Sequence, residues 1–167
     1  MKDAFISNGF SKYSGLISLE TVAQIRSHYD ALLADRTRTT HLRSDLGGKG
    51  TFGKEKITQL MRPSSLIPAL KSSEAYQNAT VHARYLMGED LVLDFDMLIN
   101  KMPYSDTPTP CHQDAAYWMD LPDKRAVSCW IALEEVVEEN GCMWFIPRKE
   151  EILYPHHSVI KGGGTSV

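Results

Sequence analysis

The period of the apolar residues changes along this chain, and that change limits the folds it can adopt. Between Leu19 and Ala34 apolar residues recur every three or four positions, the period of a helix with one buried face, and Ser18 suits its N-cap. A second helix is predicted over 73–87, ended by Gly88. Over 91–100 the odd-numbered residues are apolar and alternate with a more polar set, which predicts a strand of about ten residues with an apolar odd face.

Short strands are predicted for the second half of the chain. Residues 126–133 form an apolar run typical of a buried strand, and residues 142–146 form a second one. Between them, Asn140-Gly141 is a strong signal for a hairpin turn. Because helices come first and short antiparallel strands follow, we predict an α+β fold with a β-sandwich or barrel as its core.

Residues 35–56 have a different character, because basic side chains alternate there with threonine, serine and glycine. Gly47-Gly48-Lys49-Gly50 lacks the frame of a nucleotide-binding P-loop. Two interpretations remain open for this stretch. It is either a solvated loop or a lid that brings a cation to an anionic ligand.

Length and charge exclude several classes of protein. The 167 residues suit a single domain, residues 1–167, and the net charge of -3 gives no basic footprint for nucleic acid. No apolar run is long enough to span a bilayer. Three cysteines without a CxxC pair, and a start at Met1 without an apolar leader, indicate reduced thiols. We therefore expect a cytoplasmic protein with neither nucleic-acid nor membrane partners.

His112-Gln113-Asp114 is the candidate metal-binding motif. On an extended segment His112 and Asp114 lie on the same face, and imidazole plus carboxylate are two of the three ligands of the facial triad that holds non-haem Fe(II). Two ligands of one ion should have atoms within about 3–4 Å of each other. The alternative is that His112 is a hydrogen-bonded structural histidine.

Several stretches, in order and approximate spacing, resemble the phytanoyl-CoA dioxygenase family of Fe(II)/2-oxoglutarate oxygenases. The opening Asn8-Gly9-Phe10 also looks like the family's start. The more specific matches are Met97-Leu98-Ile99-Asn100-Lys101, His112-Gln113-Asp114, Cys129-Trp130-Ile131-Ala132-Leu133-Glu134 and Glu139-Asn140-Gly141-Cys142-Met143-Trp144-Phe145-Ile146-Pro147. The resemblance covers nearly the whole chain.

The resemblance implies a double-stranded β-helix core, a jelly roll of the cupin type, with N-terminal helices packed on it. It implies oxidative decarboxylation of 2-oxoglutarate to succinate and CO2, coupled to hydroxylation of a small organic substrate. His112 and Asp114 match the iron ligands. The positions that match the 2-oxoglutarate pocket are Lys56, Met97, Gln113 and Trp130. Without the resemblance, Met97 and Trp130 read as core residues and Gln113 as a solvated strand residue.

The sequence departs from the family after Pro147. The family's distal histidine ligand, and the arginine that binds the far carboxylate of 2-oxoglutarate, come later than this chain extends, so we expect the C-terminal strands to be lacking. His156 and His157 match a different family position, and Pro155 argues against a regular strand there, so we do not expect them to bind iron. A cupin-like metal site of His112, Asp114 and His156 is the remaining alternative.

Two function hypotheses follow. The first is an Fe(II)/2-oxoglutarate-dependent hydroxylase; the second is a non-catalytic binding module derived from the same fold. Absent strands would expose a sheet edge, so we expect a second copy or another partner to cover it. With two ligands we expect weak iron binding, and we expect Met97, Trp130 and the His-x-Asp motif to converge on one cavity.

Overall fold

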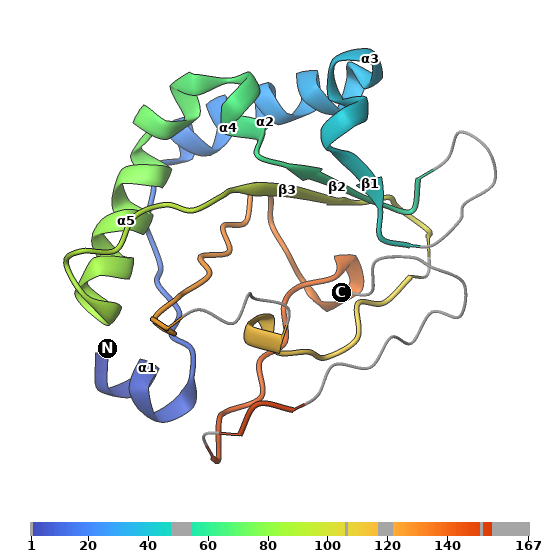
Figure 1. Cartoon of the computed structure of the whole chain (residues 1–167). Coiled ribbons are helices and arrows are strands. Elements are labelled where there is room, and N and C mark those ends of the chain that lie inside the picture. The colour runs from blue at the N-terminus through green and yellow to red at the C-terminus, as the bar shows by residue number, and fades with distance from the viewer. Residues whose placement is uncertain (1, 48–54, 106, 117–121, 151, 155–167) are drawn as a thin grey trace.

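The protein has an α+β architecture in which helices cover one face of a small antiparallel sheet (Figure 1). The computed structural model describes residues 2–47, 55–105, 107–116, 122–150 and 152–154. The helices are α1 (Lys2–Asn8), α2 (Leu19–Ala34), α3 (Arg36–Thr39), α4 (Pro63–Leu66) and α5 (Glu74–Met87). The strands are β1 (Arg43–Asp45), β2 (Ile57–Met61) and β3 (Met97–Lys101), and the 3-10 turns are η1 (Thr40–Leu42), η2 (Pro68–Ser72), η3 (Asp114–Ala116) and η4 (Glu138–Asn140).

Both predicted helices are confirmed. The first has the predicted bounds, and the Ser18 hydroxyl accepts a hydrogen bond from the Thr21 backbone N–H at 3.2 Å, as an N-cap residue should. The second begins at Glu74, one residue later than predicted, with Ser73 as its N-cap. It ends at Gly88, whose φ of +134° is a conformation that residues with a Cβ rarely adopt.

The sheet has the order β1-β2-β3, and its register corrects the strand predicted over 91–100. Only Met97–Lys101 is a strand, because β2 extends no further than Met61, the partner of Met97. The apolar odd face is also not the buried face of β3. Leu98 is buried opposite Leu60, whereas Ile99 remains exposed. The helices pack on the face that carries Leu98, and this decides which side chains are buried.

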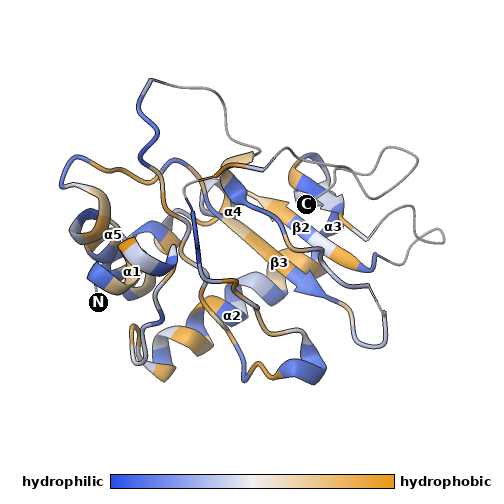
Figure 2. Ribbon diagram, turned by 90° about the horizontal axis from the view of Figure 1, so that it is seen from below, coloured by the Kyte–Doolittle hydropathy of each residue, from blue (hydrophilic) through white to orange (hydrophobic). Residues whose placement is uncertain are grey.

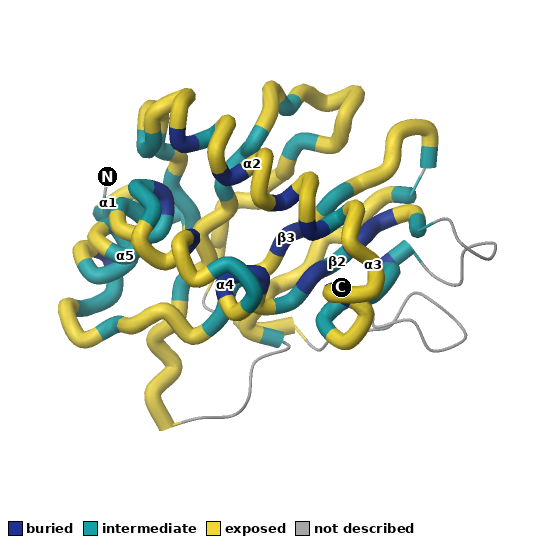
Figure 3. Tube along the Cα trace, turned by 90° about the horizontal axis from the view of Figure 1, so that it is seen from above, coloured by how far each residue is buried: buried dark blue, intermediate teal, exposed yellow. Residues whose placement is uncertain are grey.

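The core lies between α2, the sheet and the segment from η2 to α5. It consists of Ile25, Tyr29, Leu32, Leu60, Leu70, Ala75 and Leu98. Figure 3 shows the buried positions gathered where α2 and α4 overlie the strands, and Figure 2 shows apolar residues along β2 and β3. Ile131 and Leu133 pack against this core from the second half of the chain. The core therefore joins both halves of the chain.

The second half differs most from the prediction. The sequence predicts strands over residues 126–133 and 142–146, but neither stretch is a strand in the structure. A strand needs a neighbour that satisfies its backbone groups, and the described sheet contains only β1, β2 and β3. The predicted turn is present: Gly141 has φ +90°, and the Cys142 N–H donates to the Val137 carbonyl at 3.0 Å. The described residues thus form a turn without a paired hairpin, sandwich or barrel.

The stretch 35–56 is more ordered than a plain loop, because it includes α3, η1 and β1. Residues 48–54 lie outside the described residues, so the lid interpretation stays a prediction. Within the described part of the chain, no helix combines the length and apolar character needed to cross a bilayer.

Candidate metal centre

His112 and Asp114 are brought together by the loop that follows β3. His112 lies in irregular backbone and Asp114 begins η3, so the motif is not on a regular extended strand as expected. Even so, His112 Nε2 lies 3.4 Å from Asp114 Oδ1. This separation lies within the predicted range of 3–4 Å.

The His112 ring is oriented by the backbone. Its Nδ1 lies 2.8 Å from the Pro110 carbonyl oxygen, which only accepts hydrogen bonds, so Nδ1 carries a proton. In the neutral ring Nε2 is then the unprotonated nitrogen, the usual arrangement of a metal-binding histidine. The 3.4 Å between Nε2 and Asp114 Oδ1 is the separation of an ion pair when the ring is protonated, and it also suits two ligands of one cation when the ring is neutral.

Ser128 completes the local arrangement. Its hydroxyl donates to Asp114 Oδ2 at 2.6 Å, while Oδ1 of the same carboxylate faces His112. Sequence reasoning missed this residue. The available signal was weak: Ser128 stands two positions before Trp130 on an extended run, so both lie on the same face if the run is extended.

The residues that match the 2-oxoglutarate pocket have other contacts in the structure. The Gln113 side chain donates to the Ile152 carbonyl at 2.9 Å and accepts from the Tyr154 N–H at 2.7 Å. Met97 Sδ accepts a hydrogen bond from the Gln59 side chain at 3.6 Å. Trp130 is half-exposed, and the Lys56 backbone N–H donates to Asp45. Convergence of these residues on one cavity stays a prediction.

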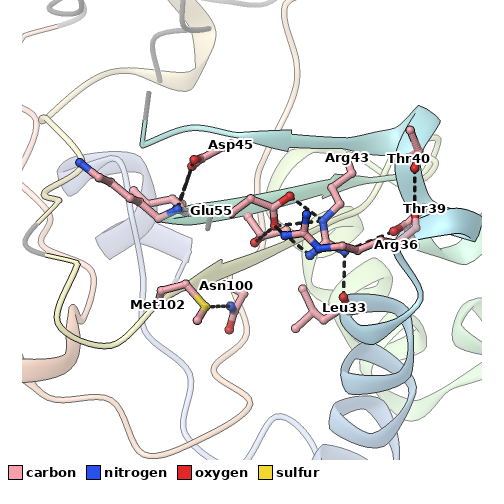
Figure 4. Close-up of polar contacts among 12 residues, drawn as sticks. Leu33, Arg36, Thr39, Thr40, Arg43, Asp45, Glu55, Asn100 and Met102 are labelled. Carbon is pink, nitrogen blue, oxygen red and sulfur yellow. Dashed lines mark hydrogen bonds and ion pairs between the residues drawn. The ribbon is translucent and has the colours of Figure 1, made fainter. Parts of the chain in front are cut away.

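Two hollows on the described surface are lined by other residues. One of about 190 Å³ lies among Arg36, Thr40, Arg43 and Glu55, whose side chains Figure 4 shows in one group. A smaller one of about 70 Å³ is lined by Arg62, Ser64, Ser65, Lys71, Leu93, Asp94, Phe95 and Asp96. Neither hollow includes a residue of the His-x-Asp motif. In the first, the Arg43 hydrogen bonds hold the pKa of Glu55 below its ordinary value.

The His112 imidazole and the Asp114 carboxylate suit a divalent metal in ligand type and in orientation. Among the described residues there is no group of three histidine, cysteine, aspartate or glutamate side chains that converge as metal ligands. His156 and His157 lie outside the described residues, so the cupin-like alternative is not tested. Among the described residues the centre therefore consists of an imidazole and a carboxylate, with the Pro110 carbonyl bonded to the first and the Ser128 hydroxyl to the second.

Comparison with known proteins gives the family. The family model described as phytanoyl-CoA dioxygenase (PhyH) matches residues 5–156, which is most of the chain. The chain belongs to the phytanoyl-CoA dioxygenase family. Membership agrees with the resemblance seen in the sequence motifs and suggests a dioxygenase-like function.

The relatives match over different extents. The chain is 45% identical to phytanoyl-CoA dioxygenase domain-containing protein 1 of Bos taurus over 51 residues, 30% of this chain and 18% of the relative. It is 24% identical to the peroxisomal phytanoyl-CoA dioxygenase of Bos taurus over 169 aligned residues, 96% of this chain and 50% of the relative. The human peroxisomal enzyme is 36% identical over 73 residues, 41% of this chain and 22% of the relative.

The chain spans half or less of the length of these curated relatives. No solved structure matches.

Proposed function

We propose that this chain is part of an Fe(II)/2-oxoglutarate-dependent dioxygenase that hydroxylates a small organic substrate. His112 Nε2 and Asp114 Oδ1 would hold the iron. The observation that carries the proposal is the 3.4 Å separation of these two atoms. The contact of Nδ1 with the Pro110 carbonyl makes Nε2 the nitrogen that would bind the metal. Iron bound there would supply the chemistry of O2 and of the chelating co-substrate.

The finer assignments rest on family membership. A double-stranded β-helix core of the cupin type is the fold that the family implies, and β1, β2 and β3 would be one part of it. Lys56, Met97, Gln113 and Trp130 are proposed to contact 2-oxoglutarate. A cytoplasmic location and a small-molecule substrate belong to the same proposal.

Metal binding by the 167-residue chain tests the site. Anaerobic titration with Fe(II), or with Co(II) as a spectroscopic substitute, should show weak binding of one ion. His112→Ala and Asp114→Ala should each reduce the affinity at least tenfold, because each removes one donor. His28→Ala, an exposed histidine on α2, is the matched control and should bind as the unaltered chain does.

Two results would contradict this assignment. The unaltered chain could fail to bind either ion at millimolar concentration, or both substitutions at the motif could leave the affinity unchanged. The first result would remove the site, and the second would place it elsewhere in the chain. Succinate formation from 2-oxoglutarate then tests the activity separately from metal binding.

A non-catalytic binding module is the second candidate, favoured by the exposed apolar side chains of residues 143–146. Trp144 is 70% exposed and Ile146 is 75% exposed. A contiguous apolar run in water is typical of a surface that another polypeptide covers. A second copy of the chain is the simplest partner, so the mass measured by light scattering should rise with protein concentration. A constant monomeric mass would show that a second copy does not cover this surface.

A further inference from the structure

Ser128 is hydrogen-bonded to one oxygen of the Asp114 carboxylate, and His112 faces the other. A carboxylate rotates about its Cβ–Cγ bond through a broad range, so its two oxygens are interchangeable unless one is held. The Ser128 hydroxyl holds Oδ2 at 2.6 Å, and Oδ1 then lies 3.4 Å from His112 Nε2. The hydroxyl must donate here, because an ionised carboxylate only accepts.

The segment that carries Ser128 is itself fixed on both sides. Three residues earlier, Arg125 makes two hydrogen bonds to the Asp90 carboxylate at 2.9 and 2.7 Å, which ties it to the end of α5. Three and five residues later, Ile131 and Leu133 pack against the core. Because the backbone is fixed on both sides of Ser128, its hydroxyl loses little further conformational entropy when it donates to Asp114.

A hydrogen bond thus orients each of the two proposed metal ligands. The Pro110 carbonyl orients the His112 ring, and the Ser128 hydroxyl orients the Asp114 carboxylate. Contacts of this kind set ligand orientation, and their loss typically weakens metal affinity about 10–100-fold. Ser128 lies fourteen residues from Asp114, so the contact is supplied by a different segment of the chain.

We propose that Ser128 is a positioning residue of the metal centre, which holds Asp114 as a ligand through Oδ1 alone. The inference rests on the proposed function, because it requires that His112 and Asp114 bind a divalent metal. Ser128 lies outside the His-x-Asp motif. Removing the hydroxyl weakens the metal site and frees Oδ2, without removing a ligand.

Co(II) titration of four variants tests the proposal. Ser128→Ala should raise the dissociation constant for Co(II) about tenfold or more. Ser128→Thr keeps a hydroxyl and should bind nearly as the unaltered chain does, whereas Ser128→Val, of the same shape as threonine, should bind as weakly as Ser128→Ala. Ser27→Ala, an exposed serine on α2, is the matched control. The visible spectrum of bound Co(II) should change in Ser128→Ala and Ser128→Val, because Oδ2 becomes free to coordinate.

The outcomes separate the two proposals. Equal affinity and an equal spectrum for Ser128→Thr and Ser128→Val would overturn the role of Ser128 while the metal site stands. Absence of Co(II) binding by the unaltered chain, or binding that survives both His112→Ala and Asp114→Ala, would overturn the metal site itself. Because threonine and valine have the same shape, a difference between these two variants reports the hydroxyl and not a packing defect.

Discussion

Arg43 shows how one side chain can join several elements. Its guanidinium donates to Glu55 from Nε and Nη2 at 2.8 Å each, and Nη1 donates to the Leu33 carbonyl at 2.9 Å and to Thr39 Oγ1 at 3.2 Å. Only 9% of the Arg43 side chain is exposed. The cluster in Figure 4 therefore links the end of α2, α3 and β1 to the segment that enters β2.

Replacing Glu55 by glutamine should destabilise the protein. The neutral amide accepts with one oxygen only, so Arg43 keeps its burial but loses a charged partner that takes three hydrogen bonds. We expect the free energy of unfolding in urea to fall by about 1–3 kcal/mol. Glu89→Gln, at an exposed site just after α5, should change it by less than about 0.5 kcal/mol. Equal stability of the two variants would mean that the charge of Glu55 contributes little to the free energy of unfolding.

The end of α5 is joined to the second half of the chain by a small charged cluster. Arg125 lies between Asp90 and Asp123, with closest nitrogen–oxygen distances of 2.7 Å to each carboxylate. Gly88 stands at the centre of this contact: a Cβ added there would lie 2.6 Å from Arg125 Nη1 and 2.9 Å from Asp90 Oδ1. The positive φ favours glycine at this helix end, and a Cβ there would also displace the ends of the Arg125 and Asp90 side chains.

Alanine at Gly88 should therefore be more destabilising than alanine at Gly15. Both glycines have positive φ, +134° and +69°, but no atom lies within 4 Å of a Cβ at Gly15. Gly15→Ala tests the strain of a φ near +69° without a steric contact, a cost of order 1–3 kcal/mol at most. Gly88→Ala combines a φ of +134°, which residues with a Cβ adopt less readily than +69°, with the displacement of Arg125, so its melting temperature should be the lower of the two. Equal melting temperatures would show that neither the φ of Gly88 nor the Arg125 contact makes alanine more costly there than at Gly15.

For the molecule as a whole, several hydrogen-bonded carboxylates have pKa values below their ordinary range. Glu74 on α5 accepts from the Thr21 hydroxyl at 2.6 Å, and this contact with those of Ser18 lowers its pKa. Arg125 lowers the pKa of Asp90, and its hydrogen bonds hold the pKa of Asp123 at about 2. The hydrogen bonds of Arg43 likewise lower the pKa of Glu55.

Acid should weaken the fold in a defined window. A carboxyl group whose pKa is lower in the folded state stabilises fully above its unfolded pKa, near 4, and loses that contribution as pH falls through its folded pKa. For Asp123 the window runs from about 3.8 to about 2. The melting temperature should be constant from pH 6 to 5 and fall between pH 4 and 2. A melting temperature that rises over that interval would contradict the assignment of these contacts.

Local patterns were sufficient for several features. The α2 helix was predicted with its observed bounds, because its period and its Ser18 cap are both contained within its own residues. The turn at Asn140-Gly141 was predicted for the same reason, since Gly141 accepts a positive φ that other residues resist. His112 and Asp114 are two positions apart, so the chain itself brings them together.

Tertiary structure decided the rest. The alternation over 91–100 indicated a strand but not its buried face, because that face depends on where α2 packs and on the pairing of Leu98 with Leu60. Residues 126–133 have the composition of a strand, yet a strand forms only beside a partner. The Ser128 contact to Asp114 likewise depends on two segments meeting in space. Sequence by itself determined the period, the caps and the motif, since these are local; long-range pairing determined burial and the contacts around the site.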